Sequence, residues 1–491
     1  MIYPNYDIFC KLADKFDRIT VFKEIFGDTT TPITLLKRFN TNKNVFLLES
    51  ADSEKKFSRF SYFGIDPEKV IIFKDNCLLE YNNCKSTRLE SSFDEYIKQN
   101  LASNRSFGDP AFGDFSGGYV GFTGYDMLNQ TTILRRKLSK TNNDLLMGLM
   151  LIENFYVFDN HKRKLFAAIS VKTGGDLKTL YKNAEGQLDN LAMILQNNEG
   201  AKTDNSGSNF EIKREMDKEI YMDKVTKIKK EIENGEVIQC VLSNKYEVLG
   251  HINPVSFYRI LRNINPSAYM FYLKFDDIVL MGSSPETHLK IVDKKALLKP
   301  IAGTYPVGED IDKIKDDLLA DEKEVSEHLM LLDLARNDLT TACDPLSVKV
   351  DKSFIPEVYS HVVHIVSEVT GVLSSDKSPL DLFINTFPAG TVSGAPKVRA
   401  MELIDKYEVS SRGFYAGCAG YFSFNGNIDT CILIRSALVE EKTTTLRAGG
   451  GIVYDSIPEK EYMEVENKLM ALLKSLEKIS DMEKQDVFIS G

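Results

Sequence analysis

Residues 417–440 read GCAGYFSFNGNIDTCILIRSALVE, two apolar runs on either side of the turn-forming triplet Asn425-Gly426-Asn427. Both runs are rich in β-branched and aromatic residues, and a short Gly-containing turn between such runs is typical of an antiparallel hairpin. We therefore predict that residues 417–424 pair with a strand over residues 429–440. Arg435, which follows the apolar residues 432–434 of that strand, would need a carboxylate or phosphate partner if it leaves a buried strand.

Strand-like runs of the same kind occur along the whole chain, and amphipathic segments with helical periodicity lie between them. The expected strands are residues 45–48, 70–73, 118–122, 165–171, 237–242, 268–273, 277–281 and 287–292. The expected helices are residues 178–196, 216–234, 319–337, 380–388, 396–406 and 458–478. Ser456 and Glu459 are expected to form a capping box at the start of the last helix. Strands followed by helices, without regular alternation of the two, favour an α+β fold over a doubly wound one.

One polar stretch interrupts this pattern. Residues 198–209 (NEGAKTDNSGSN) are rich in Gly, Ser and Asn and show no periodicity, which is typical of a loop or a boundary. We therefore divide the chain into an N-terminal region (residues 1–197), a linker (residues 198–213) and a C-terminal region (residues 214–480).

Composition limits the classes of function. The 491 residues carry a formal net charge of −10, which argues against a nucleic-acid surface. An anionic ligand would need local cations, backbone amides or a metal. No run of about 18 apolar residues occurs and the N-terminus lacks a signal-peptide pattern, so we expect neither a membrane span nor secretion. Seven scattered cysteines without a CxxC pair indicate free thiols in a reducing cytoplasm.

Two of the expected helices each carry a pair of glutamates three residues apart, Glu324 with Glu327 and Glu461 with Glu464. Each pair lies on one helix face at the edge of a buried stripe. Solvated surface carboxylates are the commoner explanation for either pair alone. Two such pairs also make a hard-cation site plausible, and a carboxylate-only ligand set suits Mg²⁺ far better than zinc.

Two glycine-rich segments and one histidine leave alternatives open. Residues 390–397 (GTVSGAPK) lack the GxxxxGK[ST] spacing of a nucleotide-binding loop, but a turn that leads into a helix is a natural site for a carboxylate. Gly449, Gly450 and Gly451 permit a close backbone approach, either by a neighbouring strand or by a ligand carboxylate. His364 lies in a mostly apolar run, where a hydrogen-bonded core histidine is the commoner outcome and acid–base chemistry is the alternative.

Five ordered blocks of the sequence resemble those of the chorismate-utilising enzymes. They are KPIAGT at residues 299–304, the segment 319–338 from LADEKE to DLARND, GTVSGAPKVRAM at 390–401, GYFSFNG at 420–426 and GIVYDSIPEKE at 451–461. The resemblance covers residues 214–478, and shorter pieces at 47–50, 59–64 and 117–126 extend it to most of the chain. It implies an α+β fold with a large mixed or antiparallel β-sheet sandwich flanked by helices. The N-terminal half would be integrated with the catalytic half.

The resemblance also implies a ligand set for chorismate and Mg²⁺. By motif match, the metal ligands would be Glu327 and Glu464, with Glu324 and Glu461 as neighbouring or alternate ligands. The substrate site would consist of the backbone amides of Gly449, Gly450 and Gly451 at the ring carboxylate, Arg435 and Tyr415 at the enolpyruvyl carboxylate, and Thr391, Ala302, Gly303 and Thr304. Glu286 matches the general acid that protonates the departing 4-hydroxyl, and His364 matches the histidine associated with loss of pyruvate.

Two positions bear on the nucleophile. Gln239, which we count among the catalytic positions, stands where isochorismate and salicylate synthases carry a lysine that activates water, and an amide cannot act as a general base. Ala302 stands where aminodeoxychorismate synthases commonly carry a nucleophilic lysine. The resemblance therefore implies direct attack of ammonia at C2 of chorismate and then loss of pyruvate to give anthranilate, a lyase reaction that begins tryptophan biosynthesis. An aminodeoxychorismate synthase without the lysine, and a non-catalytic homologue, are the alternatives.

The resemblance further implies a partner and an effector. Because no glutaminase segment is recognisable, ammonia would come from glutamine through a separate glutamine amidotransferase subunit, in a heterotetramer. L-Tryptophan would inhibit by binding between two elements, Leu48, Glu49 and Ser50 in the N-terminal region and Pro266, Ala268, Tyr269 and Met270 in the C-terminal region. Residues 1–197 would then be regulatory or scaffolding, and residues 214–480 would be the chorismate-binding catalytic domain. Two departures from the family pattern are Ala268 in place of proline and Tyr305 in place of arginine.

Overall fold

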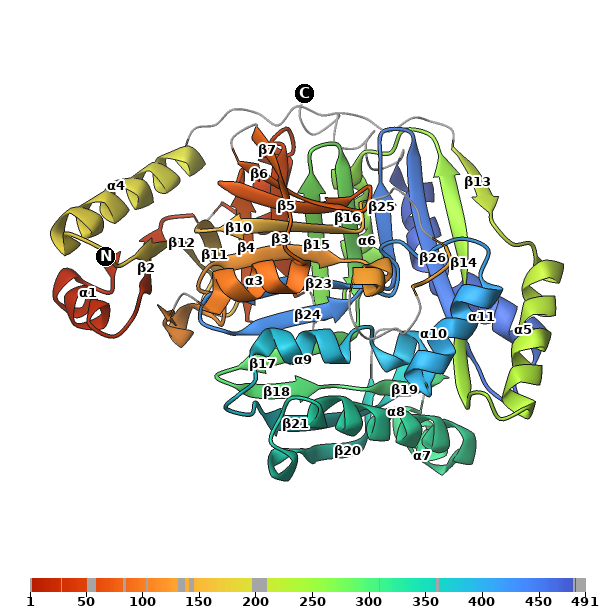
Figure 1. Cartoon of the computed structure of the whole chain (residues 1–491). Coiled ribbons are helices and arrows are strands. Elements are labelled where there is room, and N and C mark those ends of the chain that lie inside the picture. The colour runs from red at the N-terminus through yellow and green to blue at the C-terminus, as the bar shows by residue number, and fades with distance from the viewer. Residues whose placement is uncertain are drawn as a thin grey trace.

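A computed structural model describes residues 2–27, 29–50, 59–82, 85–102, 105–130, 137–140, 145–196, 210–308, 310–358, 362–479 and 482. Two large β-sheets form its centre, with fourteen and twelve strands among the described residues. Figure 1 shows helices α5 and α11 beside strands β14 and β26, whereas α7 and α8 lie against β19, β20 and β21. The predicted α+β class is confirmed.

The strands of each sheet come from both ends of the chain. In order across the first sheet they are β1 (Ile2–Tyr3), β2 (Arg18–Ile25), β12 (Lys164–Lys172), β11 (Asn154–Asp159), β4 (Phe60–Ile65), β3 (Asn44–Glu49), β15 (Tyr269–Phe275), β16 (Ile278–Ser284), β25 (Ser436–Val439), β26 (Thr443–Ile452), β14 (Gln239–Leu249) and β13 (Glu211–Arg214), with β8 (Ser106–Phe107) on β2 and β22 (Gly394–Ala395) on β14. In the second sheet they are β19 (Ile301–Pro306), β21 (Val362–Val372), β18 (Lys295–Leu298), β17 (Thr287–Val292), β24 (Ile428–Ile432), β23 (Cys418–Ser423), β9 (Gly118–Thr123), β10 (Met147–Ile152), β5 (Lys69–Lys74), β6 (Cys77–Asn82) and β7 (Lys85–Leu89), with β20 (Lys349–Val358) on β21. Apart from the parallel pair β2 and β8, the pairings among the described strands are antiparallel.

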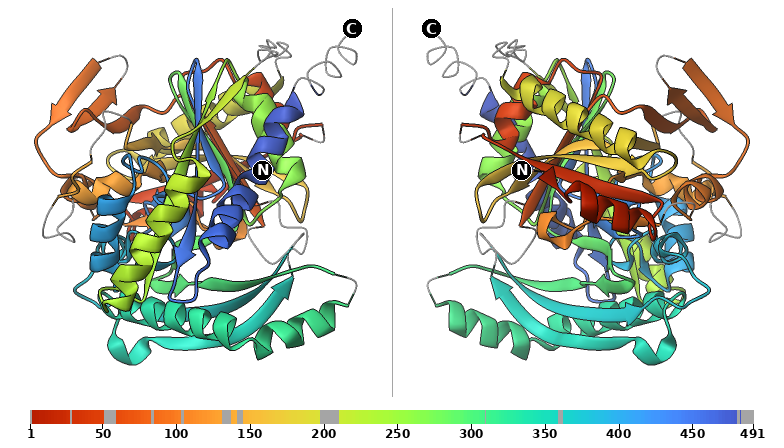
Figure 2. Two further views of the ribbon diagram at one scale, coloured as in Figure 1. Left: turned by 90° about the vertical axis from the view of Figure 1, so that its right-hand side faces the viewer. Right: turned by 90° about the vertical axis from the view of Figure 1, so that its left-hand side faces the viewer.

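The helices lie outside the sheets. They are α1 (Tyr6–Ala13), α2 (Pro32–Arg38), α3 (Phe93–Ala102), α4 (Leu177–Gln196), α5 (Lys218–Glu233), α6 (Pro254–Ile264), α7 (Ile311–Ala320), α8 (Glu322–Thr340), α9 (Pro379–Thr386), α10 (Lys397–Tyr407) and α11 (Pro458–Glu477), with short 3₁₀ turns η1 (Pro110–Phe112), η2 (Tyr125–Gln130), η3 (Pro345–Ser347) and η4 (Gly390–Val392). Figure 2 shows from two sides how the helices surround the stacked strands. None of the helices in the described residues is long and apolar enough to cross a membrane.

One apolar core lies between the two sheets. Phe275 of the first sheet meets Phe122 of the second with ring centroids 5.8 Å apart in an edge-on arrangement. Strands β9 and β23 are buried along their whole length, and therefore their sequences are apolar without strict alternation. A second core lies between the outer face of the first sheet and helices that include α4, α5, α6 and α11. The first sheet is thus covered on both faces.

The two regions of the chain share both sheets. Strand β3 of the N-terminal region pairs with β15 of the C-terminal region, with Glu49 opposite Met270. Strand β9 pairs in the same way with β23, with Val120 opposite Tyr421. Of the predicted linker, residues 198–209 lie outside the described residues, and residues 211–213 belong to β13. The boundary between the two regions is therefore defined in the sequence alone, since both regions contribute strands to each sheet.

The prediction for residues 429–440 is wrong in one respect. The hairpin forms, with Gly420 opposite Thr430, but its second arm ends at Ile432. The chain then crosses from the second sheet to the first and continues as β25. Arg435 lies at this crossover with φ = 50°, a left-handed conformation that is uncommon for a residue other than glycine. A turn between the sheets, and not a strand, therefore positions Arg435.

The predicted helix over residues 319–337 is mostly α8, and only residues 319 and 320 belong to the preceding helix α7. Asp321, with φ −76° and ψ 104°, has an extended conformation that ends α7, and its carboxylate accepts the amide of Lys323 at 2.9 Å to cap α8. Tyr305 donates a 2.8 Å hydrogen bond to the same carboxylate and thereby ties β19 to the start of α8. The capping box expected at Ser456 is absent, because Ile457 is the N-cap residue of α11 and makes no side-chain cap. The Ser456 hydroxyl accepts the amide of Val453 instead.

Candidate active site

Several of the predicted site residues share one neighbour, Lys468. Its ammonium group lies 2.7 Å from a carboxylate oxygen of Glu464 and donates a 2.9 Å hydrogen bond to the carbonyl of Gly449. Burial alone would lower the pKa of Lys468, but the Glu464 carboxylate outweighs it and the pKa is raised. The same charge acts on the predicted site residues Glu286, Glu327, His364, Tyr415 and Glu461. These side chains therefore belong to one site, built from α8, α11, β21, β26 and the residues that precede β17.

Sequence analysis did not identify Lys468. A signal was present, because Lys468 follows Glu464 by four residues on a predicted helix and therefore lies on the same face. Its ammonium group is a local cation of the kind that an anionic ligand needs in this acidic protein.

Gly449 and Gly451 of β26 face strand β14, whereas a Cβ on Gly450 would lie 3.3 Å from Oε2 of Glu461. A Cβ on Gly449 would lie 3.0 Å from the carbonyl oxygen of Leu242 and 2.9 Å from the hydroxyl of Tyr415. A Cβ on Gly451 would lie 2.4 Å from the amide nitrogen of Gln239, so any larger residue would displace that side chain. A close approach by the backbone of the neighbouring strand is therefore confirmed at Gly449. Binding of a ligand carboxylate by these amides remains a prediction.

Glu286 is buried in the short segment between β16 and β17. Burial raises the pKa of Glu286 to about 7, because removal from water disfavours the charged carboxylate. The adjacent Thr391 hydroxyl and the positive charge of Lys468 act in the opposite direction on this pKa but do not cancel the rise. A carboxyl group with such a pKa is partly protonated near neutral pH and can donate a proton.

His364 extends from β21 beside β19. Its Nδ1 is 3.0 Å from the carbonyl oxygen of Gly303, and because a carbonyl can only accept, Nδ1 carries the proton. Burial lowers the pKa of His364 to about 4, against the effect of that hydrogen bond. The imidazole is therefore neutral at physiological pH, the state in which it can accept a proton. Ala302 is buried one position from Gly303, and Thr304 is opposite His364 in the strand register.

The four predicted metal ligands form a cluster of mutually repelling carboxylates. Burial raises the pKa of Glu327 to about 7, and the charges of Glu324 and Glu464 raise it further. Burial and the charge of Glu464 likewise raise the pKa of Glu461. The Oε2 atom of Glu461 is buried and has no hydrogen-bond partner among the described residues. A cation would relieve both the repulsion and the unpaired oxygen.

These residues fit Mg²⁺ of the kind that enzymes share with substrate. In the described part of the chain, no three His, Cys, Asp or Glu side chains are arranged to hold a metal ion by themselves. Mg²⁺, however, commonly takes one or two protein carboxylates and completes its shell with water and substrate oxygens. The four glutamates can supply the one or two carboxylates that Mg²⁺ needs from the protein.

Comparison with known proteins agrees with this geometry. Residues 43–474 match the family described as chorismate binding enzyme. The chain belongs to the chorismate-binding enzyme family. It is 36% identical to the anthranilate synthase component 1 of Acetivibrio thermocellus, over 98% of this chain and 100% of that protein. It is also 36% identical to the anthranilate synthase component 1 of Aquifex aeolicus, over 95% and 96% of the two chains.

Solved structures of chorismate-binding enzymes share the fold. The crystal structure of anthranilate synthase component I from Streptococcus pneumoniae matches with a TM-score of 0.76 at 30% identity, over 92% of this chain and 99% of that one. The menaquinone-specific isochorismate synthase from Escherichia coli matches with a TM-score of 0.70 at 18% identity, over 96% and 98% of the chains. At that identity the second match bears on the fold alone. The predicted sandwich of sheets and helices is thereby confirmed.

The predicted tryptophan-binding elements of this chorismate-binding enzyme lie side by side. Leu48 is opposite Phe271, and Glu49 is opposite Met270, where β3 pairs with β15. Glu49 is buried and accepts hydrogen bonds from Arg262 at 2.7 Å and Tyr258 at 2.8 Å. Of the remaining predicted residues, Ser50 follows β3 directly, Pro266 and Ala268 precede β15, and Tyr269 is the first residue of β15. The structure therefore brings the two elements together, and their binding of tryptophan remains a prediction.

Proposed function

We propose that the chain is the chorismate-binding, ammonia-using large subunit of an anthranilate synthase. The observation that carries this proposal is the hydrogen bond made by Gln239. Its side-chain amide nitrogen donates to the carboxylate of Glu327 at 3.3 Å. A neutral amide in this place cannot take a proton from water, so an added hydroxyl group is disfavoured. Ala302 likewise supplies no nucleophile. The names of the relatives from Acetivibrio thermocellus and Aquifex aeolicus support the same activity.

In the proposed reaction the residues of the site move two protons. Glu286 donates its proton to the 4-hydroxyl of chorismate, which leaves as water while ammonia forms a bond to C2. The neutral imidazole of His364 then accepts the proton of C2 as the bond from C3 to the enolpyruvyl oxygen breaks. Pyruvate leaves after its enolate takes up that proton from His364, the ammonium group on C2 returns one proton to the Glu286 carboxylate, and the ring becomes aromatic. The products are anthranilate, pyruvate and water.

Charged groups would position the substrate for these steps. Arg435 and the buried Tyr415 hydroxyl would bind the enolpyruvyl carboxylate, and the amides of Gly449 to Gly451 would bind the ring carboxylate. Glu327 and Glu464 would hold Mg²⁺, with Glu324 and Glu461 beside them. When bound, the metal would offset the negative charge of the ring carboxylate and of the four glutamates.

The proposal includes a partner, an effector and a compartment. Ammonia would come from a glutamine amidotransferase subunit in a heterotetramer, which agrees with the designation component 1 in the relatives. L-Tryptophan would bind beside β3 and β15 and inhibit the enzyme. The six cysteines that the structure describes are free, which supports a reducing compartment, the cytoplasm.

A product assay tests the proposal directly. Purified chain is mixed with chorismate, MgCl₂ and an ammonium salt, and the products are separated by chromatography with fluorescence detection. We expect anthranilate and pyruvate in equal amounts. Dominant 4-amino-4-deoxychorismate would favour the aminodeoxychorismate synthase alternative. Absence of any chorismate turnover with correctly folded protein would favour a non-catalytic homologue.

A further inference from the structure

One aspartate of the N-terminal region is hydrogen-bonded to the turn that carries Tyr415. Asp126 lies in η2, which follows β9. Its buried carboxylate accepts a 2.8 Å hydrogen bond from the backbone amide of Gly413, 287 residues further along the chain. Residues 413–416 form the turn, and Tyr415 is its third residue. The hydrogen bond therefore joins the N-terminal region to a segment of the predicted substrate site.

The backbone of this turn is unusual and depends on its contacts. Gly413 has φ = 60° and Ala416 has φ = 63°, a left-handed conformation that is uncommon for alanine. Such a conformation persists only where the surrounding structure holds it. The amide of Ala416 donates to the carbonyl of Leu433 at 3.0 Å, and the amide of Gly413 donates to Asp126. These two bonds hold the turn on either side of Tyr415.

The two regions are in direct backbone contact at this place. A Cβ on Gly124 would lie 2.6 Å from the carbonyl oxygen of Gly413 and 2.8 Å from that of Leu146. Position 124 therefore has no room for a side chain, because both neighbours are backbone atoms. Asp126 follows Gly124 by two residues, and this close packing holds its carboxylate against the turn.

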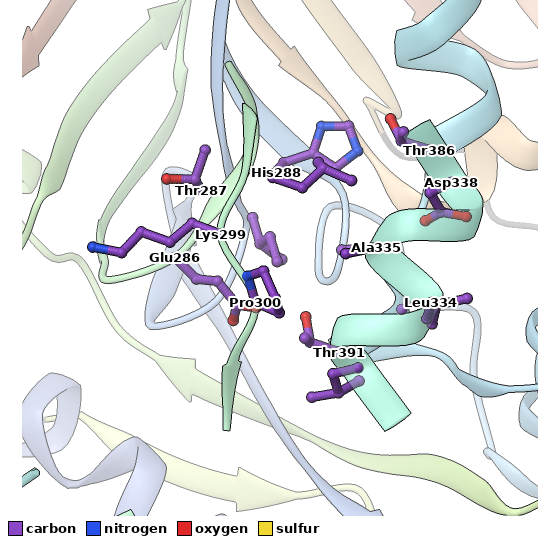
Figure 3. Close-up of a pocket in the computed structure, with 15 residues that line it drawn as sticks. Glu286, Thr287, His288, Lys299, Pro300, Leu334, Ala335, Asp338, Thr386 and Thr391 are labelled. Atoms are coloured by element: carbon purple, nitrogen blue, oxygen red, sulfur yellow. The ribbon is translucent and has the colours of Figure 1, made fainter. Parts of the chain in front are cut away.

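Arg412, the residue before Gly413, connects the turn to the pocket that contains the predicted general acid. Its guanidinium group donates a 2.7 Å hydrogen bond to the carbonyl of Val392. Val392 follows Thr391, and Figure 3 shows the Thr391 side chain next to Glu286 in the pocket that both residues line. A displacement of the segment 412–413 would therefore affect the predicted site at two places.

The N-terminal region also contacts Arg412. The guanidinium carbon of Arg412 lies 4.7 Å from the ring centroid of Tyr125 and 5.6 Å from that of Tyr415. A cation at this distance is attracted by the face of an aromatic ring. Two adjacent residues of η2 thus hold two adjacent residues of the turn segment, Tyr125 with Arg412 and Asp126 with Gly413.

Asp126 accepts its hydrogen bond as a charged group at alkaline pH. Burial raises the pKa of Asp126 to about 6, whereas the Gly413 amide and the positive charges of Arg447 and Arg412 act in the opposite direction. The carboxylate is therefore ionised at pH 8, and a charged acceptor forms a stronger hydrogen bond than a neutral one. Loss of this acceptor would leave the buried amide of Gly413 without a partner, which is unfavourable.

We propose that Asp126 is a positioning residue for chorismate, which acts through the amide of Gly413 and places the Tyr415 hydroxyl at the enolpyruvyl carboxylate. This inference rests on the proposed function in one respect, the assignment of Tyr415. The motif match at residues 117–126 gives Asp126 no role. The N-terminal region thereby contributes to substrate binding and not only to regulation or scaffolding.

The test measures the Kd for chorismate by calorimetry in the full-length chain at pH 8, with Mg²⁺ and without ammonium. In Asp126→Ala we expect the Kd to rise by about three- to tenfold, the effect of one lost hydrogen bond. Asp126→Asn, whose side-chain carbonyl can accept from the same amide, should recover most of the loss. Asp126→Leu fills the volume without an acceptor, should raise the Kd as Asp126→Ala does, and replaces that variant if its cavity prevents folding.

A double-mutant cycle separates positioning from a general loss of stability. Tyr415→Phe removes the hydroxyl through which Asp126 acts, and it should itself raise the Kd for chorismate. In the Tyr415→Phe background, Asp126→Ala should add less than about twofold, whereas two independent effects would multiply. The same cycle is measured with Asp126→Leu.

Asp159 provides the matched control. It is also a buried aspartate of the N-terminal region that accepts a backbone amide, that of Lys162 at 3.0 Å, but it ends β11, a strand without any predicted site residue. Asp159→Ala should reproduce a general loss of stability and leave the Kd for chorismate unchanged.

Two results would overturn the inference alone. One is an unchanged Kd in the folded Asp126→Ala or Asp126→Leu variant, and the other is an effect of these changes that multiplies fully with that of Tyr415→Phe. If Tyr415→Phe by itself leaves the Kd unchanged, the assignment of Tyr415 in the proposed function fails, and the inference fails with it.

Discussion

The side-chain amide of Gln239 donates a hydrogen bond to the carboxylate of Glu327, with 3.3 Å between the nitrogen and the oxygen. The bond links the position that would activate water in related synthases to a predicted metal ligand. Hydrogen bonds to the charged form of a carboxyl group lower its pKa. Burial and the charges of Glu324 and Glu464 raise the pKa of Glu327 to about 7, and we expect the hydrogen bond from Gln239 to act in the opposite direction.

Replacement of Gln239 should consequently change the acid limb of the pH profile. In Gln239→Leu the pKa of Glu327 rises further, so a higher pH is needed to ionise it, and kcat/KM for chorismate should begin to rise at a higher pH. The measurement is kcat/KM against pH at constant Mg²⁺. Gln130→Leu, which removes an amide that donates to Asn76 at 3.2 Å, is the control and should leave the limb in place. An unshifted acid limb in Gln239→Leu would contradict this coupling.

Glu286 should determine how kcat falls on the alkaline side of the pH profile. Its pKa of about 7 lies above the ordinary value of a glutamate, so the proton is present below pH 7 and is lost as the pH rises. At saturating free ammonia, kcat should therefore fall above about pH 7, although the supply of ammonia increases. Glu286→Gln should lower kcat by about 10²- to 10⁴-fold and abolish this limb. Persistence of the alkaline limb in the variant would assign the proton to another group.

The glutamate cluster should show opposite effects on activity and stability. Glu327→Gln should abolish Mg²⁺-supported turnover, because a neutral amide is a poor ligand for a hard cation. It should leave the Tm of metal-free protein equal or higher, since it removes a charge that Glu324 and Glu464 repel. Glu322→Gln, an exposed change on the same helix α8, is the control for both measurements. Near wild-type turnover in Glu327→Gln would show that this residue is not a ligand.

Local patterns predicted the elements well but not their partners. The expected strand at residues 287–292 coincides with β17, because alternation of side chains is a property of neighbouring residues. The pairing of β3 with β15 joins segments more than two hundred residues apart, and periodicity contains no information about it. The end of the hairpin strand at Ile432 was missed for the same reason. The residues before and after Arg435 are both mainly apolar, so their composition does not indicate that they join different sheets.

The candidate site shows a similar division. Motif matches identified Glu286, His364 and the two glutamate pairs, since these residues lie in blocks with fixed spacing. Lys468 was not identified. It is visible in the helical spacing from Glu464, whereas its hydrogen bond to the Gly449 carbonyl depends on the packing of α11 against β26 in the folded chain. A contact between distant elements is a property of packing and leaves no pattern in the sequence.

The source of ammonia gives a prediction that needs no mutation. The purified chain should form anthranilate with ammonium salts and form none with glutamine, because no glutaminase segment is recognisable in its sequence. Glutamine should support turnover after addition of a glutamine amidotransferase subunit, and a variant of that subunit without its nucleophilic cysteine should remove the effect. The measurement is anthranilate fluorescence with each nitrogen source. Glutamine-dependent activity of the chain alone would contradict the prediction.

Inhibition by tryptophan would require a connection between the predicted effector site and the active site, and the structure contains a short one. The hydroxyl of Tyr269, at the start of β15, donates a 2.9 Å hydrogen bond to Asp429. Asp429 lies on β24 in the opposite sheet, and that strand leads directly to Arg435. A ligand that binds better to one arrangement of β15 and β24 would therefore change the position of a predicted chorismate-binding arginine.

Ser50→Phe should relieve inhibition by L-tryptophan with little change in uninhibited turnover. Ser50 follows β3 directly and is partly buried, so a phenyl ring there would occupy the predicted pocket, whereas the residues around Glu286 would be unaffected. Couplings between sites are typically about 1–3 kcal/mol, which is a readily measured change in chorismate affinity. The measurement is a tryptophan titration at subsaturating chorismate, with Ser86→Phe on the exposed strand β7 as the control. If millimolar tryptophan leaves the wild-type enzyme uninhibited, β3 and β15 serve as scaffold alone.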